Sequence, residues 1–315
     1  MQKALQLVSP LDRYVSDFLK ENYSRKTYLL VALFLAITIT INYYLDFESV
    51  YIRRPDFFAR WVSYILFYGF AYFIALLLMK WAGEKLAFLK STKFWLLSIF
   101  GLVIISLDGS FKFSYSIAKS IFEPEEYRYI GRLIYEGKPF FLVFLPLLVM
   151  WNFTRIKGDS FYGLSRQSVS YRPYILILLF MFPLMLLAIS DPEFLTTYPK
   201  FKTFGVEQYW GVNIKTLILP FESLYAWSFF TTELFFRGFL VIGMMRIMGT
   251  HAILPMVCMY AFLHFEKPVA ETIGSVFGGF LLGAIAYKSK NIWGGVFVHI
   301  GVAMMMELIA YWGNL

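Results

Sequence analysis

Residues 27–45 read TYLLVALFLAITITINYYL, nineteen residues without a charged side chain between Lys26 and Asp46. A helix needs about 20 mainly apolar residues to cross the hydrocarbon layer of a bilayer. This stretch therefore predicts a membrane-spanning helix and sets the class of the whole chain.

Eight further apolar segments follow this first one along the chain. Together they predict an all-α, polytopic transmembrane bundle of eight or nine spans. One of them, 216–248, is longer than a single crossing, so we expect it to tilt or bend. The connections 108–138 and 191–214 are predicted surface loops with short amphipathic helices. The eight segments are 61–80, 94–107, 139–153, 174–190, 216–248, 250–266, 271–287 and 291–312.

The composition excludes the main soluble classes. Of 315 residues 59% are hydrophobic and only 16% are charged, and the mean hydropathy is +0.60. Soluble domains carry about a quarter charged residues, so a soluble enzyme, a disordered chain and a disulfide-rich module are excluded. Cys258 is the single cysteine and cannot form an internal bridge. The net charge of +8 fits the positive-inside bias of membrane proteins and gives no reason to expect nucleic-acid binding.

The charges of the connections predict the orientation. Basic connections alternate with mixed ones, as a cytoplasmic N-terminus in a plasma (inner) membrane requires. Residues 1–26 are too polar for a signal peptide. They predict an interfacial helix capped by Ser9, with Leu11, Val15, Phe18 and Leu19 on one face. We therefore divide the chain into this helix, N-terminal spans over 27–215 and a C-terminal bundle over 216–315.

The C-terminal bundle holds nearly all the ionisable residues predicted at membrane depth. Such residues are costly in a bilayer and therefore mark functional sites by default. Glu233 lies 13 residues before Arg246, and His264 lies 13 residues after His251, each about 20 Å from a basic edge at 1.5 Å per residue. The full set is Glu222, Glu233, Arg237, His264, Glu271, His299 and Glu307.

His299 lies nine residues after Lys290, about 14 Å in by the same rise. Glu233, His264 and His299 are thus expected at similar depths on consecutive segments, where a carboxylate and two imidazoles can activate a water. Arg237 follows Glu233 at i+4 and can pair with it. Close helix approach is expected at Gly274, Gly278, Gly279, Gly283, Gly294 and Gly295.

A plain structural interpretation stands beside each of these assignments. Glu233 and Arg237 can form a buried ion pair that only locks two helices. Either histidine can be a hydrogen-bonded core residue. Glu271 and Glu307 can lie near the outer interface and be hydrated.

Three short motifs in this half resemble those of the CPBP family, the CAAX proteases and bacteriocin-processing proteins. The stretch 231–238, TTELFFRG, is similar to the family motif E-E-x-x-x-R; YAFLH at 260–264 is similar to F-x-x-x-H; and HIGVA at 299–303 is similar to H-x-x-x-N. The likeness covers about residues 216–312. It includes the type II CAAX prenyl endopeptidases.

The resemblance implies an intramembrane endopeptidase that acts on a prenylated or otherwise membrane-bound protein. It implies that Glu233 and His264 activate the attacking water, that His299 stabilises the oxyanion and that Arg237 orients Glu233. Amide hydrolysis needs a base for water and donors aimed at the developing oxyanion.

Two positions depart from the family pattern. Thr232 occupies the place of the first Glu, and Ala303 that of the Asn. Three alternatives follow: Glu233 is the base, Glu271 or Glu307 has replaced it as an auxiliary carboxylate, or hydrolysis is lost.

Competing functions remain open at this stage. Glu233, His264 and His299 would also suit zinc geometrically, giving a metalloprotease-like site, although a metal-free mechanism fits equally well. A non-catalytic relative would instead be a binding module for a lipidated protein. A proton-coupled transporter ranks last, because no inverted repeat is found.

Overall fold

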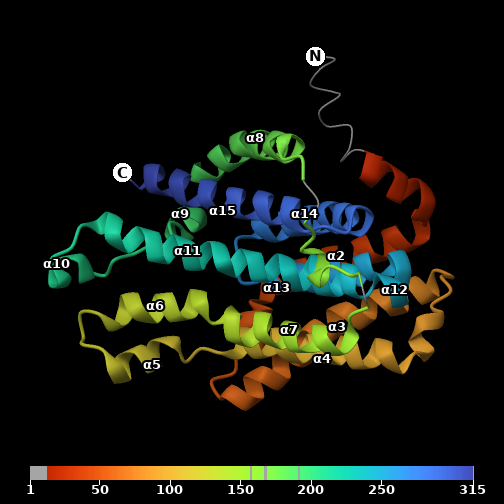
Figure 1. Ribbon diagram of the computed structural model, residues 1–315, viewed down its shortest axis with the longest axis horizontal. Helices are drawn as coiled ribbons and strands as arrows, with labels where there is room; N and C mark the ends of the chain where they lie inside the picture. The colour runs from red at the N-terminus through yellow and green to blue at the C-terminus, as the bar shows by residue number, and fades with distance from the viewer. Residues whose placement is uncertain (1–12, 157, 167–168, 191, 315) are drawn as a thin grey trace. The chain divides into compact units, whose positions relative to one another are not determined.

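The computed structural model describes residues 13–156, 158–166, 169–190 and 192–314, and every regular element among them is a helix. Within this part of the chain, eight helical segments are long and apolar enough to cross a membrane. This confirms the predicted all-α membrane bundle (Figure 1). The segments are Arg25–Leu45, Phe57–Trp81, Thr92–Ser110, Tyr127–Thr154, Arg172–Ser190, Ile214–Leu263, Val269–Ser289 and Trp293–Gly313.

Among the described residues there are eight such segments where the sequence predicts nine apolar segments, because the predicted segments 216–248 and 250–266 form one continuous helical segment, Ile214–Leu263. Ile214–Leu263 contains 50 residues, about 75 Å of helix, which is more than twice the hydrocarbon thickness of about 30 Å. The backbone turns within it at Gly249, where φ is +59°. The segment consists of α11 (Ile214–Glu233), the π-helical η6 (Leu234–Gly243), α12 (Met245–Met248), η7 (Gly249–Ala252) and α13 (Ile253–Leu263).

The helices form two compact units, each made from three stretches of the chain. Unit 1 comprises Met1–Ser110, Pro146–Gln167 and Leu234–Ile292, and unit 2 comprises Phe111–Leu145, Ser168–Glu233 and Trp293–Leu315. Besides η6, α12, η7 and α13, unit 1 contains α2 (Arg25–Leu45), η1 (Glu48–Ile52), α3 (Phe57–Trp81), η2 (Ala87–Lys90), α4 (Thr92–Ser110), most of α7 (Leu145–Thr154), η4 (Phe161–Gly163) and α14 (Val269–Ser289). Besides α11, unit 2 contains α5 (Ser114–Ile121), α6 (Tyr127–Gly137), η3 (Phe140–Phe144), α8 (Arg172–Leu187), η5 (Ala188–Ser190), α9 (Pro192–Thr197), α10 (Val206–Trp210) and α15 (Trp293–Gly313).

The helix α13 is the centre of unit 1. It packs against α3 on one side and α14 on another. Every residue from Ile253 to Phe262 is buried, and only Leu263, the last residue of α13, is partly exposed. Phe262 lies 4.7 Å from Phe67 of α3 and 4.5 Å from Phe265, measured between ring centroids. Stacked aromatic rings therefore fix the end of α13 that leads into His264.

Glycines of α14 allow its close approach to α13. A Cβ atom at Gly279 would lie 3.1 Å from the Tyr260 ring, and one at Gly283 would lie 2.7 Å from Met256. The predicted close packing is confirmed at these two positions. It is wrong at Gly274 and Gly278, which have open space beside them.

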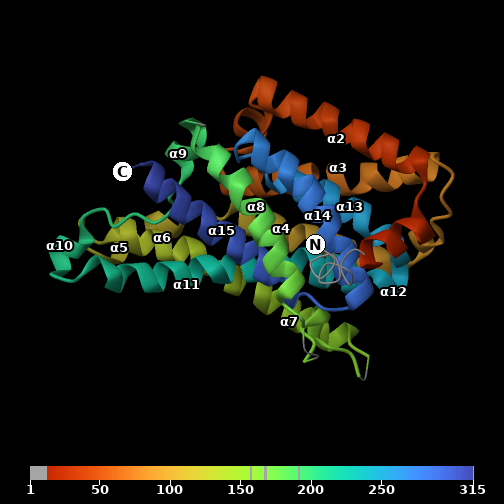
Figure 2. The same ribbon diagram turned by 90° about the horizontal axis from the view of Figure 1, so that it is seen from above.

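Unit 2 is built around α11, which packs against α6 and α15 (Figure 2). Phe221 and Tyr225 of α11 form a buried cluster with Ala303 of α15. The other face of α15 receives α8, because Gly294 and Gly301 leave room for Tyr174 and Leu178. The helix that carries His299 is therefore held on two sides.

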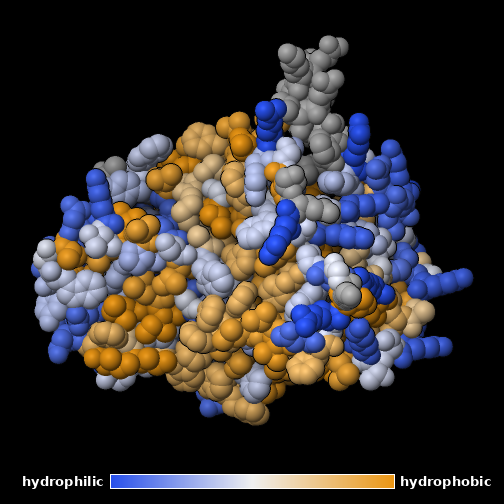
Figure 3. Space-filling view, viewed as in Figure 1, coloured by the Kyte–Doolittle hydropathy of each residue, from blue (hydrophilic) through white to orange (hydrophobic). Residues whose placement is uncertain are grey.

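Apolar side chains also cover much of the surface, as the face in Figure 3 shows. On α8 the side chains of Leu179, Phe180 and Leu187 are all more than half exposed. Lipid is the expected solvent for such a surface, since an apolar patch of this kind would be a liability in water.

The segment before the first span is helical over residues 13–22. Phe18 is buried against the rings of Phe280 and Tyr287 on α14, and Glu21 pairs with Lys288. The apolar face predicted here thus contacts protein. The predicted cap Ser9 lies outside the described residues.

Candidate active site

Glu233 and His299 meet in unit 2. Glu233 is the last residue of α11 and is 0% exposed. His299 lies one and a half turns into α15, and its Nδ1 is 2.9 Å from Glu233 Oε1. The Phe229 ring, one turn before Glu233, lies 4.6 Å from the imidazole between centroids. Two of the predicted site residues are therefore a hydrogen-bonded pair in an apolar setting.

The backbone at Gly295 makes room for this pair. A Cβ atom at Gly295, one turn before His299, would lie 2.7 Å from Glu233 Oε2. Real side chains do not approach an oxygen so closely, hence glycine is needed for the carboxylate to sit against α15. The predicted close approach at this glycine is confirmed, and its partner is the carboxylate.

The pair is suited to stabilise positive charge on the imidazole. Glu233 Oε1 accepts the Nδ1–H of His299, as a carboxylate does behind the histidine of a hydrolytic triad, and would stabilise an imidazolium that forms there during a reaction. The protonated ring then carries a second N–H on Nε2, which can donate to an oxyanion.

Arg237 and His264 lie in unit 1, and both pack against Tyr260. The guanidinium of Arg237 lies 4.3 Å from the centroid of the Tyr260 ring, which is a cation–π contact. The rings of Tyr260 and His264 are 4.5 Å apart between centroids. Tyr260, the first residue of the second motif, thus contacts both Arg237 of the first motif and His264, the last residue of the second.

The tautomer of His264 follows from its backbone contact. Its Nδ1 lies 2.8 Å from the carbonyl oxygen of Tyr260. A carbonyl oxygen can only accept, so Nδ1 carries the hydrogen and the neutral ring has its lone pair on Nε2. His264 follows α13 directly as its C-cap residue, and this arrangement is that of a general base.

Of the two auxiliary carboxylates, Glu307 accepts backbone hydrogen bonds and Glu271 lies at the start of a helix. Glu307 accepts hydrogen bonds of 2.7–3.1 Å from the backbone N–H groups of Lys200 and Phe201, and so fastens the connection after α9 to α15. Glu271 lies in the first turn of α14, where the helix dipole favours a negative charge. Each carboxylate therefore has a structural explanation.

The two positions that depart from the family motifs also have local partners. Thr232 donates its hydroxyl to the backbone carbonyl of Ser228, one turn earlier, at 2.8 Å. Ala303 is buried against Phe221 and Tyr225. Neither position offers a base or a donor of the kind the family motif supplies there.

The zinc alternative finds no support in the arrangement of ligands. Among the described residues, no group of three or more His, Cys, Asp and Glu side chains is placed to hold a metal ion. A structural or catalytic zinc site needs at least three protein ligands.

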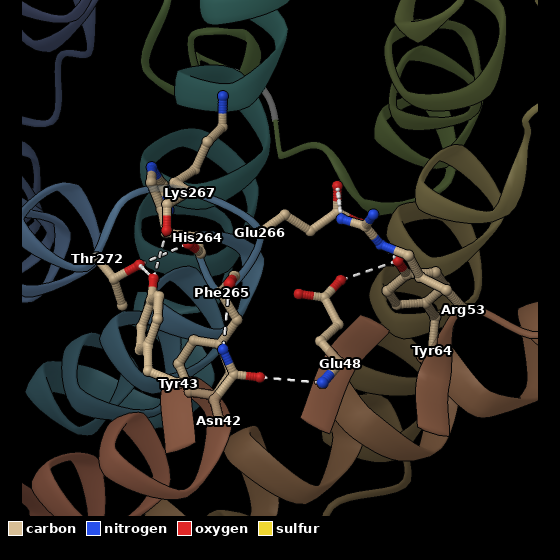
Figure 4. A network of polar contacts seen from close by, with 10 residues as sticks. All are labelled: Asn42, Tyr43, Glu48, Arg53, Tyr64, His264, Phe265, Glu266, Lys267 and Thr272. Carbon is tan, nitrogen blue, oxygen red and sulfur yellow. Dashed lines mark hydrogen bonds and ion pairs between the residues drawn. The ribbon is translucent and has the colours of Figure 1, made fainter. Parts of the chain in front are cut away.

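The sequence interpretation missed a polar cluster in unit 1 (Figure 4). Glu48 of η1 is buried, and Tyr64 of α3 donates to it at 2.9 Å. Tyr64 also contacts Glu266, two residues after His264, at 2.9 Å. Burial first, and then repulsion from Glu266, raises the pKa of Glu48 to about 9. The signal in the sequence was the pair of acids at 48 and 266; Glu48 lies in a connection of mixed charge and Glu266 ends the predicted span 250–266, and neither was predicted as a site residue.

Comparison with protein families bears on these residues. Residues 215–305 match the Rce1-like family of type II CAAX prenyl endopeptidases. This confirms the resemblance found in the motifs. The Rce1-like segment covers less than a third of the chain and contains Glu233, Arg237, His264 and His299. Comparison with curated proteins and with solved structures gives no match.

The match suggests a function of the CAAX prenyl endopeptidase type for the Rce1-like segment. Together with the apolar helices it supports an integral membrane protease.

Proposed function

We propose that this protein is an intramembrane endopeptidase that hydrolyses a peptide bond in a membrane-associated, prenylated protein. The observation that carries the proposal is the buried Glu233–His299 hydrogen bond. It joins the acid of the first motif to the histidine of the third, within the segment that matches the family.

In the proposed reaction, Glu233 and His264 together activate the attacking water. His264 takes the proton on Nε2, the nitrogen opposite the one held by Tyr260. Glu233 supplies the negative charge that stabilises a positively charged imidazole at His299. The water oxygen bonds to the carbonyl carbon, and the carbonyl oxygen becomes an oxyanion.

His299 donates its Nε2–H to that oxyanion while Glu233 holds its Nδ1–H. When the intermediate collapses, the C–N bond breaks and the protonated His264 gives its proton to the leaving amine. We assign Arg237 to orient Glu233. The apolar surroundings strengthen each of these electrostatic contacts.

The test is cleavage of a farnesylated CAAX peptide by the purified full-length protein in lipid nanodiscs. Loss of a general base costs roughly 10²–10⁴-fold, so His264→Gln and Glu233→Gln are expected to lose at least 100-fold in kcat/KM. Loss of an oxyanion donor costs roughly 10²–10³-fold, which is the expectation for His299→Gln.

The third histidine of the chain is the matched control. His251 contacts the backbone of Met248 and the side chain of Glu84, and it lies in no family motif. His251→Gln is therefore expected to cleave at the wild-type rate. Equal losses in all three histidine variants, or unchanged cleavage by His264→Gln, would reject the proposal.

A second candidate is a binding module without catalytic activity. It is favoured by Thr232, whose hydroxyl is bonded to its own helix, and by the apolar packing of Ala303. Binding of the farnesylated peptide by a wild-type protein that does not cleave it would support this alternative. Orientation with the N-terminus in the cytoplasm of a plasma membrane is part of the proposal in either case.

A further inference from the structure

The turn that carries His264, residues 264–267, is held from outside by side chains. Thr272 of α14 donates its hydroxyl to the carbonyl oxygen of His264, and Tyr43 of α2 donates to that of Lys267. Asn42 of α2 donates from Nδ2 to the carbonyl oxygen of Phe265 at 3.1 Å. Within the turn, the carbonyl oxygen of His264 also accepts the N–H of Lys267 at 2.9 Å. The side chains from α2 and α14 add contacts that hold the turn in place from outside.

The third residue of the turn, Glu266, belongs to an acid cluster, which we define as Glu48, Arg53, Tyr64 and Glu266 (Figure 4). Arg53 binds both oxygens of Glu266, with Nε 2.8 Å from Oε1 and Nη2 2.6 Å from Oε2. Such a bidentate pair keeps Glu266 ionised. On the other side, the Tyr64 hydroxyl lies 2.9 Å from Glu266 Oε1 and 2.9 Å from Glu48 Oε1.

The hydrogen bonds in the acid cluster need one more proton than the Tyr64 hydroxyl supplies. The Tyr64 hydroxyl carries a single hydrogen, yet its oxygen lies within hydrogen-bond distance of two carboxyl oxygens. If Tyr64 donates to the ionised Glu266, the contact with Glu48 needs a proton on Glu48. One proton on Glu48 also leaves one carboxylate facing one guanidinium, so the cluster is neutral.

Glu48 is linked to the turn by a second route through its backbone. The Glu48 N–H donates to Asn42 Oδ1 at 3.0 Å, and the amide of Asn42 donates onward to Phe265. Glu48 is thus linked to both residues that follow His264. Asn42 bridges it to Phe265, and Tyr64 bridges it to Glu266. Moving η1 away would release both.

We propose that Glu48 is a positioning residue for His264, and that a proton shared along Glu48, Tyr64 and Glu266 fastens η1 to the turn. Its catalytic consequence rests on the function proposed above. Loss of this proton places two carboxylates against one tyrosine hydroxyl in a buried place, which favours release of the turn. Among the described residues, Tyr68 is a further titratable group packed against the cluster, because its ring stacks on Tyr64.

The sign of the pH dependence follows from the direction of the shift. The pKa of Glu48 is raised from 4.5 to about 9. Between these values the fastened turn keeps a proton that the released turn has lost. The fastened state is therefore fully favoured below about pH 4.5, and the population ratio falls by up to tenfold per pH unit until about pH 9.

Amide hydrogen exchange in the full-length protein in lipid nanodiscs tests this directly. We expect the protection factors of residues 262–267 to fall with pH between 5.5 and 9 in the wild type, by up to tenfold per unit. Glu48→Gln, which mimics the protonated acid, should keep high protection at every pH. Glu84→Gln, a carboxylate of unit 1 that pairs with His251, is the matched control and should follow the wild type.

Three results would overturn the proposal: wild-type protection that does not change with pH, a Glu48→Gln variant that titrates like the wild type, or a Glu84→Gln variant that loses the pH dependence. If Glu48→Gln does not fold, the same measurement on Tyr64→Phe tests the proposal instead. This substitution removes the bridging hydroxyl and is expected to lower protection at pH 6 and to flatten the slope; an unchanged slope rejects the shared proton.

The exchange measurement needs no cleavage, so the two proposals can fail separately. With the farnesylated peptide, Glu48→Gln is expected to abolish the loss of kcat between pH 7 and 9 while leaving KM unchanged. A protein that shows the exchange behaviour but cleaves nothing would keep the role of Glu48 and lose the protease assignment.

Discussion

At the scale of the residue, the position of Glu233 depends on the absence of a side chain at Gly295. The buried carboxylate occupies the volume that a methyl group at 295 would need, and from there it reaches His299. A buried acid beside an imidazole is costly unless the two are hydrogen-bonded. The glycine therefore belongs to the candidate site although it carries no functional group.

Gly295→Ala tests this dependence. A Cβ atom 2.7 Å from Glu233 Oε2 must displace the carboxylate and break or lengthen the bond to His299. Losing a charged buried hydrogen bond is worth about 1.5–3 kcal/mol, so kcat/KM for the farnesylated peptide should drop by roughly 10- to 100-fold. Gly278→Ala, with open space beside it, is the control and should cleave normally; a normal rate in both would contradict this account of Gly295.

A second residue-scale prediction concerns Glu307, which the sequence offered as a substitute base. Both of its oxygens accept backbone N–H groups, those of Lys200 and Phe201. Glu307→Ala leaves these donors without their acceptor and should lower the free energy of unfolding by about 1–3 kcal/mol. Thermal unfolding in detergent measures the loss. The exposed Glu125→Ala removes the same charge and should leave the unfolding temperature unchanged.

The sequence identified part of the site at this scale and overlooked the rest. Glu233 and His299 stood out because an ionisable residue inside an apolar segment is rare. Glu48 did not, because an acid in a connection between spans is ordinary, and Glu266 did not, because it is the last residue of the predicted span 250–266. Only the fold shows that Tyr64, near the start of the predicted span 61–80, bridges those two acids.

At the scale of the element, η6 and η4 pack so closely that one position of η6 must be a glycine. This π-helical stretch carries Arg237 and Gly238, and η4 packs against it. A Cβ atom at Gly238 would lie 2.8 Å from the backbone oxygen of Tyr162. Backbone cannot move aside as a flexible side chain can, so η4 and η6 fit together only with glycine at this position.

Gly238→Ala is therefore expected to destabilise unit 1 by about 1–3 kcal/mol, the usual cost of overpacking a core. The readout is the unfolding temperature of the full-length protein in detergent. Gly274→Ala adds the same methyl group where space is open and should not lower it. If Gly238→Ala unfolds at the same temperature as the wild type, then η4 can move to admit the methyl group, and the prediction is wrong.

The sequence predicted the helices better than their internal geometry. Spans such as Arg25–Leu45 and Val269–Ser289 agree with the predicted segments, because apolar length is a strong signal. The fourth span begins at Tyr127 rather than 139, because the amphipathic α6 precedes the apolar stretch. The π-helical hydrogen bonding of η6 has no signature in composition, and the sequence did not predict it.

At the scale of the whole molecule, the alternation of basic and mixed connections predicts which ends face the cytoplasm. Lys90 and Arg54 are both exposed and lie on opposite ends of the span Phe57–Trp81. With the N-terminus in the cytoplasm, Arg54 and the nearby Glu48 would face outward. The acid cluster would then respond to the pH outside the cell.

Single cysteines at these two positions test the orientation. Cys258, the native cysteine, is 0% exposed and should not react. In intact cells a membrane-impermeant maleimide is expected to label Arg54→Cys and to leave Lys90→Cys unlabelled until the membrane is opened. The reverse pattern would invert the topology, and labelling of both from outside would remove the span between them.

The contact between Gly295 and Glu233 also limits how this protein can diverge. A larger residue at 295 becomes tolerable only if the acid retreats, as a shortened Asp at 233 would do by one methylene. The two positions should therefore change in step among descendants of this chain. Engineers who wish to reshape the site will have to alter them as a couple.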